Sequence, residues 1–521
     1  MDHAAHPARL RLAALLAAVL LALPGFALAQ SRATVLSPQE PATLMPHFDL
    51  LTLTHEVQHL IFDCLFVVGP DGDYLPQLAT EVPTLANGGV SEDGSTYTIR
   101  LRDDVQWHDG EPLTSEDVRF TWQVITDEEL PIPSRAVWEQ VESVETPDDR
   151  TAVIRFADTN VNFLGRAASD ACFVLPSHLL AGADLNDHGF HRAPVGTGPY
   201  TLEQWSAGAF ARLEANDAYF DGAPSIDEIV VQFTGGSQAT RTALQRGEAE
   251  LALHLGQADL RFAQGLAGYE VRQGPAHAWW QFWVDNDDPV LSDVRVRRAL
   301  AHGLDRELIT ETVMGGVVEP QHAMLPESHW AHDDDVRTYP YDVDAAAALL
   351  DEAGWDTVGS DGVRTRDGER LTLEILNIAG EVERRQVIQI AQDLWSDLGI
   401  DASIREIDGA GFPSTMAAGD YQLAYGWFGE NQEPVFNLWL GTNWQNFGNE
   451  PALDLLRGVS STVDRDARGE AIREFQRVVA EEAAMLPLAP RPLLNVASDR
   501  LDGYAPTLSG SLWNAYEWTL R

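Results

Sequence analysis

The sequence contains no lysine and only two cysteines among its 521 residues. Its 35 basic residues are therefore all arginines, and they face 80 acidic residues, which gives a formal net charge of −45 at pH 7. This excess of negative charge argues against nucleic acids and anionic membrane surfaces as partners. It would suit cationic ligands, but we favour a solvated acidic surface adapted to salt, because net charge reflects solubility and salt more than any binding site.

Long apolar runs are also scarce, and the clearest one lies near the N-terminus. Arg9 and Arg11 precede an apolar stretch over residues 12–23, which is followed by Pro24-Gly25 and then by Ala27-Leu28-Ala29. This order is typical of a secretory signal peptide, so we expect export to a periplasm and cleavage near Ala29. No later segment reaches the roughly 20 apolar residues that a transmembrane helix needs. Cys64 and Cys172 could pair in an oxidising compartment, although a chain of this length can fold without a disulfide.

The most informative segment covers residues 92–122 and reads EDGSTYTIRLRDDVQWHDGEPLTSEDVRFTW. Apolar and polar residues alternate over residues 96–102, and this two-residue period predicts a half-buried strand. Thr114 is placed to cap a helix whose first turn contains Glu116 and Asp117, where free backbone N–H groups favour carboxylates. The segment therefore predicts a strand, a turn and a capped helix without requiring any catalytic residue.

This segment resembles the signature of the family 5 extracellular solute-binding proteins, the peptide- and nickel-binding group of ABC importers. Other elements similar to that family follow in order: PVGTGPY at residues 194–200, DVRVRRAL at 293–300, and YDVD followed by a short helix at 341–355. The resemblance covers essentially everything after the signal peptide. It implies an α/β fold of the two-lobed periplasmic-binding-protein type, a Venus-flytrap clamp with a small extra domain inserted in the first lobe.

The resemblance also implies boundaries and a function. We expect a signal peptide at 1–29, a discontinuous first lobe at 30–275 with an inserted subdomain at about 52–185, a second lobe at 276–490, and a C-terminal return to the first lobe at 491–521. The expected function is capture of a solute between the lobes and its delivery to a permease and ATPase complex in the inner membrane. The protein is expected to be a monomer, to need no cofactor and to catalyse no reaction.

Aromatic residues are the first candidates for the binding site. Trp279, Trp280 and Phe282 come just before the point where the resemblance places the crossover into the second lobe, and Trp427 and Trp444 form a second group. An indole offers a flat apolar face and one N–H donor, which suits stacking on peptide side chains or sugar rings. Packing in a hydrophobic core is the alternative role for each of these residues.

The segment GWFGENQEP at residues 426–434 resembles the family's GW-x-x-DY-x-DP element, whose first acid holds the α-ammonium group of a bound peptide. Glu430 occupies the position of that acid, and Asn431 replaces the tyrosine. Asn431 and Asn446 would also suit hydroxyl-rich ligands. The expected ligand is therefore an oligopeptide, with an oligosaccharide second and a metal chelate third.

Two alternative functions belong to other functional classes. His55, Glu56 and His59 form an HExxH match, the helix motif in which two histidines hold zinc and the glutamate activates water. No third ligand can be assigned from the sequence, so a secreted zinc hydrolase is a remote alternative. A periplasmic sensor would bind the same solute but signal to a receptor, and the sequence does not separate sensing from transport.

Overall fold

The computed structural model describes residues 31–169, 172–430, 432–434, 436–441 and 443–521. The predicted signal peptide lies outside the described residues, and so does the candidate site residue Asn431. Helices and strands are mixed along the chain, so the predicted α/β class is confirmed. Within the described ranges, every helix is too short or too polar to cross a membrane.

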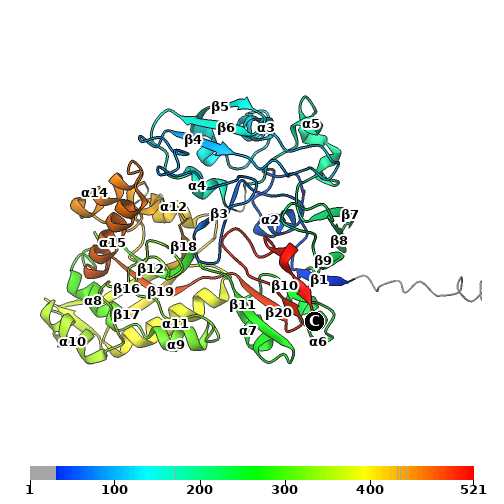
Figure 1. The fold of residues 1–521 in the computed structure, drawn as a ribbon. Helices are drawn as coiled ribbons and strands as arrows, with labels where there is room; N and C mark the ends of the chain where they lie inside the picture. The colour runs from blue at the N-terminus through cyan, green and yellow to red at the C-terminus, as the bar shows by residue number, and fades with distance from the viewer. Residues whose placement is uncertain (1–30, 170–171, 431, 435, 442) are drawn as a thin grey trace, which may run out of the picture.

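A seven-stranded sheet forms the centre of the first lobe, the name used below for the part built around it (Figure 1). Its spatial order is β11 (Tyr269–Gln273), β20 (Leu494–Ser498), β10 (Leu251–Ala252), β1 (Arg32–Ser37), β9 (Glu228–Phe233), β8 (Phe210–Ala215) and β7 (Tyr200–Ser206). Strand β1 runs parallel to β10 and to β9. Its Ala33, Val35 and Leu36 are fully buried, as expected for a central strand covered on both faces.

A five-stranded sheet forms the centre of the second lobe, named in the same way. Its order is β17 (Asp401–Ile407), β16 (Thr372–Ile378), β18 (Leu423–Gly429), β12 (Ala278–Val284) and β19 (Met485–Pro490). Strand β16 pairs in parallel with β17 and β18, whereas β12 is antiparallel to β18 and β19. The second lobe therefore combines a parallel half with an antiparallel half.

A smaller three-stranded sheet lies apart from both lobes, at the top of Figure 1. Its order is β4 (Thr96–Arg100), β6 (Thr151–Phe156) and β5 (Val141–Asp148), and helix α3 (Ser115–Thr126) packs on it. Strand β4 and helix α3 confirm the strand and the capped helix expected from residues 92–122. At the cap, the carboxylate of Asp117 accepts a hydrogen bond from the Thr114 backbone N–H at 2.8 Å. This part has a hydrophobic core of its own.

Two connections join the large sheets, and we call them the hinge segments. Residues 274–277 lead from β11 to β12, and residues 491–493 lead from β19 to β20. The two segments are adjacent, because the N–H of Gly274 donates to the carbonyl of Leu493 at 3.1 Å. Paired connections of this kind let two lobes rotate about a common line.

The remaining elements complete the lobes. The helices of the first lobe and of the smaller part are α2 (Thr52–Gln58), α4 (Phe163–Ala167), α5 (Ser177–Leu180), α6 (Ser237–Gln245) and α7 (Gln257–Gln264). Those of the second lobe are α8 (Val294–His302), α9 (Arg306–Thr312), α10 (Val343–Glu352), α11 (Val382–Asp397), α12 (Phe412–Ala417), α13 (Asn437–Leu440), α14 (Glu450–Val459) and α15 (Arg465–Glu481). Short 3₁₀ turns are η1 (Ala136–Gln140), η2 (Leu185–Asp187), η3 (Gly189–His191) and η4 (Ala515–Glu517). Short strands are β2 (Phe66–Val68), β3 (Tyr74–Pro76), β13 (Thr357–Val358), β14 (Arg364–Arg366), β15 (Glu369–Arg370), β21 (Leu501–Asp502) and β22 (Thr519–Leu520).

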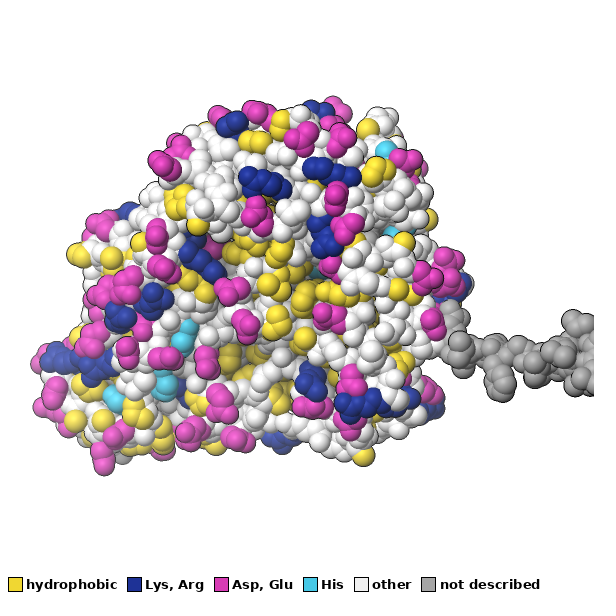
Figure 2. All heavy atoms as spheres, viewed as in Figure 1, with side chains coloured by type: hydrophobic (Ala, Val, Ile, Leu, Met, Phe, Trp, Pro, Cys, Tyr) yellow, Lys and Arg dark blue, Asp and Glu magenta, His cyan; other side chains and the backbone are white. Residues whose placement is uncertain are grey.

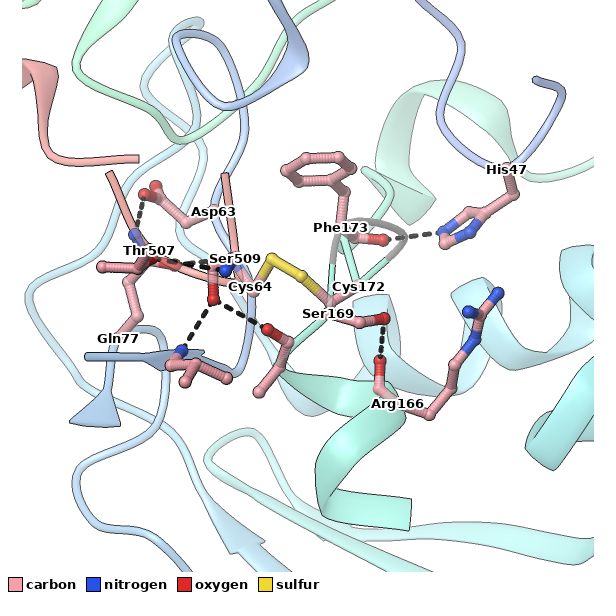
Figure 3. The surroundings of a disulfide bond; sticks show 12 residues. His47, Asp63, Cys64, Gln77, Arg166, Ser169, Cys172, Phe173, Thr507 and Ser509 are labelled. Carbon is pink, nitrogen blue, oxygen red and sulfur yellow. Dashed lines mark hydrogen bonds between the residues drawn. A yellow bond between two sulfur atoms is a disulfide. The ribbon is translucent and has the colours of Figure 1, made fainter. Parts of the chain in front are cut away.

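Cys64 and Cys172 are joined by a disulfide, which resolves the alternative that the sequence left open (Figure 3). The bond ties the two ends of the chain segment that contains the three-stranded sheet, since the cysteines are 108 positions apart. Ser509 of the C-terminal tail lies beside it. Its hydroxyl accepts from the N–H of Val68 at 2.6 Å and donates to the carbonyl of Ala168 at 2.8 Å. The tail therefore bridges both ends of the segment that the disulfide closes.

Candidate functional site

A cavity of about 740 Å³ lies between the two lobes and beside one hinge segment. The first lobe contributes Thr52, His254, Leu255, Gly256, Leu260 and Leu494, and the hinge segment contributes Arg491, Pro492 and Leu493. The second lobe contributes Trp280, Met314, Val317, Val318, Ile378, Glu381, Glu383, Arg384, Trp427 and Pro490. Figure 2 shows hydrophobic side chains gathered at the centre of one face, with acidic side chains spread around them. A cavity of this size and mixed lining suits a small organic solute.

Two tryptophans form one wall of the cavity. Trp280 of β12 and Trp427 of β18 are direct partners in the antiparallel pair, so their side chains project from the same face of the sheet. The ring of Trp280 stacks on Tyr425, with the ring centroids 5.6 Å apart and the planes 16° from parallel. Trp427 remains 48% exposed, which is high for a side chain of this size. This wall offers flat apolar surface to a ligand.

Charged groups of both signs lie in the same cavity. Arg384, in the first turn of α11, donates to the carbonyl of Tyr425, and burial lowers the pKa of its guanidinium. Glu381 and Glu383 start the same helix and also line the cavity. The second arginine, Arg491, comes from the hinge segment. The cavity can therefore attract both the positive and the negative groups of one ligand.

The glutamate of the HExxH match holds the C-terminal tail in place. Glu56 is 1% exposed, and its carboxylate accepts from the backbone N–H groups of Ser511 at 2.6 Å and Leu512 at 3.0 Å. It also accepts from Nε2 of His254 at 3.1 Å, and His254 lines the cavity. Burial alone would raise the pKa of Glu56, but the His254 hydrogen bond and the charge of His59 lower it. No cluster of three or more metal-ligating side chains occurs in the described part of the chain.

The other aromatic candidates lie in hydrophobic cores. Phe282 is fully buried and packs against Trp395 and Tyr425, with ring centroids 5.4 and 4.9 Å away. Trp279 is on the opposite face of β12, 1% exposed, with its indole N–H donating to Gln281. Trp444 packs in the second lobe among other aromatic rings. The cavity lining thus contains two of the five aromatic candidates, Trp280 and Trp427.

Two polar candidates can be placed: Glu430 directly follows strand β18, and Asn446 contacts the residue that follows strand β12. Glu430 is 5% exposed, and its backbone N–H donates to the carbonyl of His277 in the first hinge segment at 2.9 Å. Asn446 donates from its side-chain amide to the carboxylate of Asp285 at 2.8 Å. Glu430 is therefore placed beside a hinge, while the amide of Asn446 is engaged within the second lobe.

The loop after β18 also contacts the part of the molecule that carries the three-stranded sheet. The phenol of Tyr74 donates to Glu433 at 3.2 Å, and the side-chain amide of Gln432 donates to the carbonyl of Gly72 at 3.0 Å. Glu433 forms a buried ion pair with Arg468 at 2.8 Å. Burial raises the pKa of Glu433, and Arg468 partly offsets this effect. These hydrogen bonds hold the two sides of the molecule together in this structure.

Comparisons with known proteins identify the family. The family model of the bacterial extracellular solute-binding proteins, family 5 Middle, matches residues 73–449. The oligopeptide-binding protein AppA of Bacillus subtilis (strain 168) is 25% identical over 444 residues, which cover 82% of this chain and 81% of that protein. The dipeptide-binding protein of Escherichia coli (strain K12) is 25% identical over 451 residues, covering 80% of this chain and 82% of that protein.

The fold of a solved structure agrees with this match. HbpA2 from Haemophilus parasuis superposes with a TM-score of 0.82 at 20% identity, covering 94% of this chain and 100% of that one. The protein is a bacterial extracellular solute-binding protein with the two-lobed fold of its class. It belongs to family 5 of these proteins, as the resemblance of residues 92–122 and the later elements predicted.

Proposed function

We propose that this protein is the periplasmic substrate-binding protein of an ABC importer, which captures an oligopeptide and delivers it to a permease and ATPase complex. The observation that carries the proposal is the cavity of about 740 Å³ whose walls come from both lobes and a hinge segment. Two relatives that are named for oligopeptide and dipeptide binding support the peptide as ligand. In this function the chain is exported after cleavage near Ala29, acts as a monomer and catalyses no reaction.

Lobe closure would work as a population shift. A ligand in the cavity contacts side chains of both lobes only when the lobes are closed, so its binding energy favours the closed state. We assign residues 30–275 and 491–521 to the first lobe, with the inserted subdomain at about 52–185, and residues 276–490 to the second. The hydrogen bond between Tyr74 and Glu433 would add a ligand-independent contribution to closure.

The peptide itself would be held by few fixed contacts. Trp280 and Trp427 offer stacking surface that accepts many side chains without requiring one sequence. Glu430, beside the first hinge segment, would pair with the α-ammonium group of the peptide, as the resemblance implies. Water and backbone groups would supply the remaining polar contacts in such a tolerant site.

The proposal is tested by native mass spectrometry of the protein purified from its own periplasm, followed by denaturing release of the cargo. A heterogeneous set of short peptides is the expected result. A series of sugars or a metal chelate would move the function to another ligand of the same fold. One stoichiometric zinc ion without organic cargo would contradict the proposal and favour the HExxH hydrolase.

A further inference from the structure

An arginine without a counter-ion stands out in a chain with 80 acidic residues. Arg491 lies in the hinge segment between β19 and β20 and lines the cavity. Its backbone N–H donates to the carbonyl of Ala278 at 2.8 Å, which fixes the start of the side chain. Among the residues that the structure describes, its guanidinium forms neither an ion pair nor a hydrogen bond. The other cavity arginine, Arg384, at least donates to a backbone carbonyl.

The guanidinium of Arg491 lies over the rings of the two tryptophans of the wall. Its central carbon lies 4.3 Å from the ring centroid of Trp427 and 5.7 Å from that of Trp280. Such stacking stabilises the cation through the ring quadrupole but uses none of its five N–H donors. Burial removes part of the hydration of Arg491 and thereby lowers its pKa. A stacked, partly dehydrated guanidinium with unused donors is matched by the two oxygens of a carboxylate.

The charges around the cavity define what else the ligand must carry. Arg384 adds a second cation, and neither cavity arginine pairs with a carboxylate among the described residues. Glu381 and Glu383, at the start of α11, bring negative charge to the same cavity. A simple anion would be repelled by these glutamates. A ligand with separate positive and negative groups can instead place its negative group near the arginines and its positive group near the glutamates.

We propose that Arg491, stacked on Trp427 and Trp280, is a binding residue for a carboxylate of the ligand. The carboxylate comes either from the C-terminus of a peptide or from an acidic side chain. This inference rests on the proposed function, because it assigns one end of the proposed peptide. It places the recognised group on a hinge segment, so that binding there contacts the connection about which the lobes move.

Titration calorimetry with three tripeptides tests the assignment on the full mature chain. The probes are trialanine, trialanine amide and Ala-Glu-Ala amide, compared on the wild type, Arg491→Gln and Arg491→Lys. We expect the wild type to bind trialanine about 10- to 100-fold more tightly than its amide, the range of a charge-assisted hydrogen-bond pair. Arg491→Gln should remove that difference, and Arg491→Lys should retain part of it because the charge remains without the planar fork.

A matched control separates charge recognition from general damage. The guanidinium of Arg366 also lies on a tryptophan, 4.4 Å from the ring centroid of Trp355, but outside the cavity lining. Arg366→Gln should therefore leave all three affinities unchanged, and thermal unfolding of each variant verifies that it is folded. If Ala-Glu-Ala amide binds the wild type more tightly than it binds Arg491→Gln, a side-chain carboxylate can also serve as the group that Arg491 binds.

The outcomes distinguish this inference from the function on which it rests. If wild type binds trialanine and its amide equally well, the carboxylate assignment is wrong while peptide binding stands. If Arg491→Gln leaves the preference for the free acid unchanged, another residue recognises the carboxylate. If no tripeptide binds the wild type at all, both the carboxylate assignment and the peptide function fail.

Discussion

Loss of the disulfide is expected to loosen one part of the molecule selectively. The bond between Cys64 and Cys172 closes a loop of 108 positions, and this loop contains the whole three-stranded sheet. By chain entropy, a closed loop of this length stabilises the folded segment by about 5 kcal/mol. The value is an upper limit, because the ends of the loop also meet through Ser509, which hydrogen-bonds near both of them.

The suitable assay is hydrogen exchange with mass spectrometry on a Cys64→Ser, Cys172→Ser double variant, since global unfolding of a multi-lobed chain is not two-state. We expect faster exchange in β4, β5 and β6, and unchanged exchange in β12 and β16 of the second lobe. Wild type treated with a reductant should match the variant. Equal protection of the three-stranded sheet in both proteins would refute the reasoning, and a uniform loss throughout the chain would show that the segment does not unfold separately.

Three further perturbations follow from buried contacts. Tyr74→Phe removes the hydrogen bond to Glu433, which should destabilise the closed state by about 1 kcal/mol. The affinity for trialanine, measured by calorimetry, should therefore fall about fivefold. An unchanged affinity would show that this contact does not favour the closed state. Glu56→Ala leaves two backbone N–H groups of the C-terminal tail without their acceptor and should destabilise the tail locally by about 2–5 kcal/mol, with Glu56→Gln less affected. Hydrogen exchange over residues 505–521 should therefore be faster in Glu56→Ala, and unchanged exchange there would contradict this role of Glu56. Burial raises the pKa of Asp63 from 3.8 to about 7, so its contribution to stability should fall as pH rises from about 4 to 7 and stay level above that. Asp63→Asn should remove this part of the pH dependence of unfolding. An unaltered pH profile in the variant would contradict this reasoning.

Local signals were sufficient for the elements that surround the site. The alternation over residues 96–102 predicted β4, and Asp293 caps α8 by accepting a hydrogen bond from the N–H of Arg295 at 3.0 Å. Gly354 and Gly399, which directly follow the C-caps of α10 and α11, have φ angles of +86° and +79°, which favour glycine. These features depend on neighbours within a few residues, so the sequence contains the information directly. The exact lobe boundaries remain a prediction.

The choice among the aromatic candidates could not be made in this way. Strand β12 reads AWWQFWV, with aromatic side chains at both odd and even positions, so the two-residue period does not show which face meets the cavity. Trp279 and Trp280 are neighbours in the sequence, yet one lies in a core and the other in the cavity wall. Only the packing of helices against each face of the sheet separates them.

The HExxH match shows the same limit of local patterns. Its spacing describes one turn of a helix, but the partners of Glu56 are a tail 455 positions further along the chain and His254. Arg491 gave no signal at all, because a single arginine between prolines has no periodicity and no motif. Both residues take their roles from contacts between distant segments, which a local pattern does not encode.

The position of Arg491 links the charge of the ligand to the movement of the lobes. Strand β19 belongs to the second sheet and β20 to the first, so any rotation of one lobe against the other changes the backbone around residues 491–493. The stacking partners of Arg491, Trp280 and Trp427, both belong to the second lobe. A carboxylate bound by Arg491 would therefore stabilise the hinge segment in the arrangement that keeps its side chain on the tryptophan wall. An amidated peptide would lose this contribution as well as the direct contact, so closure should depend on the free carboxylate.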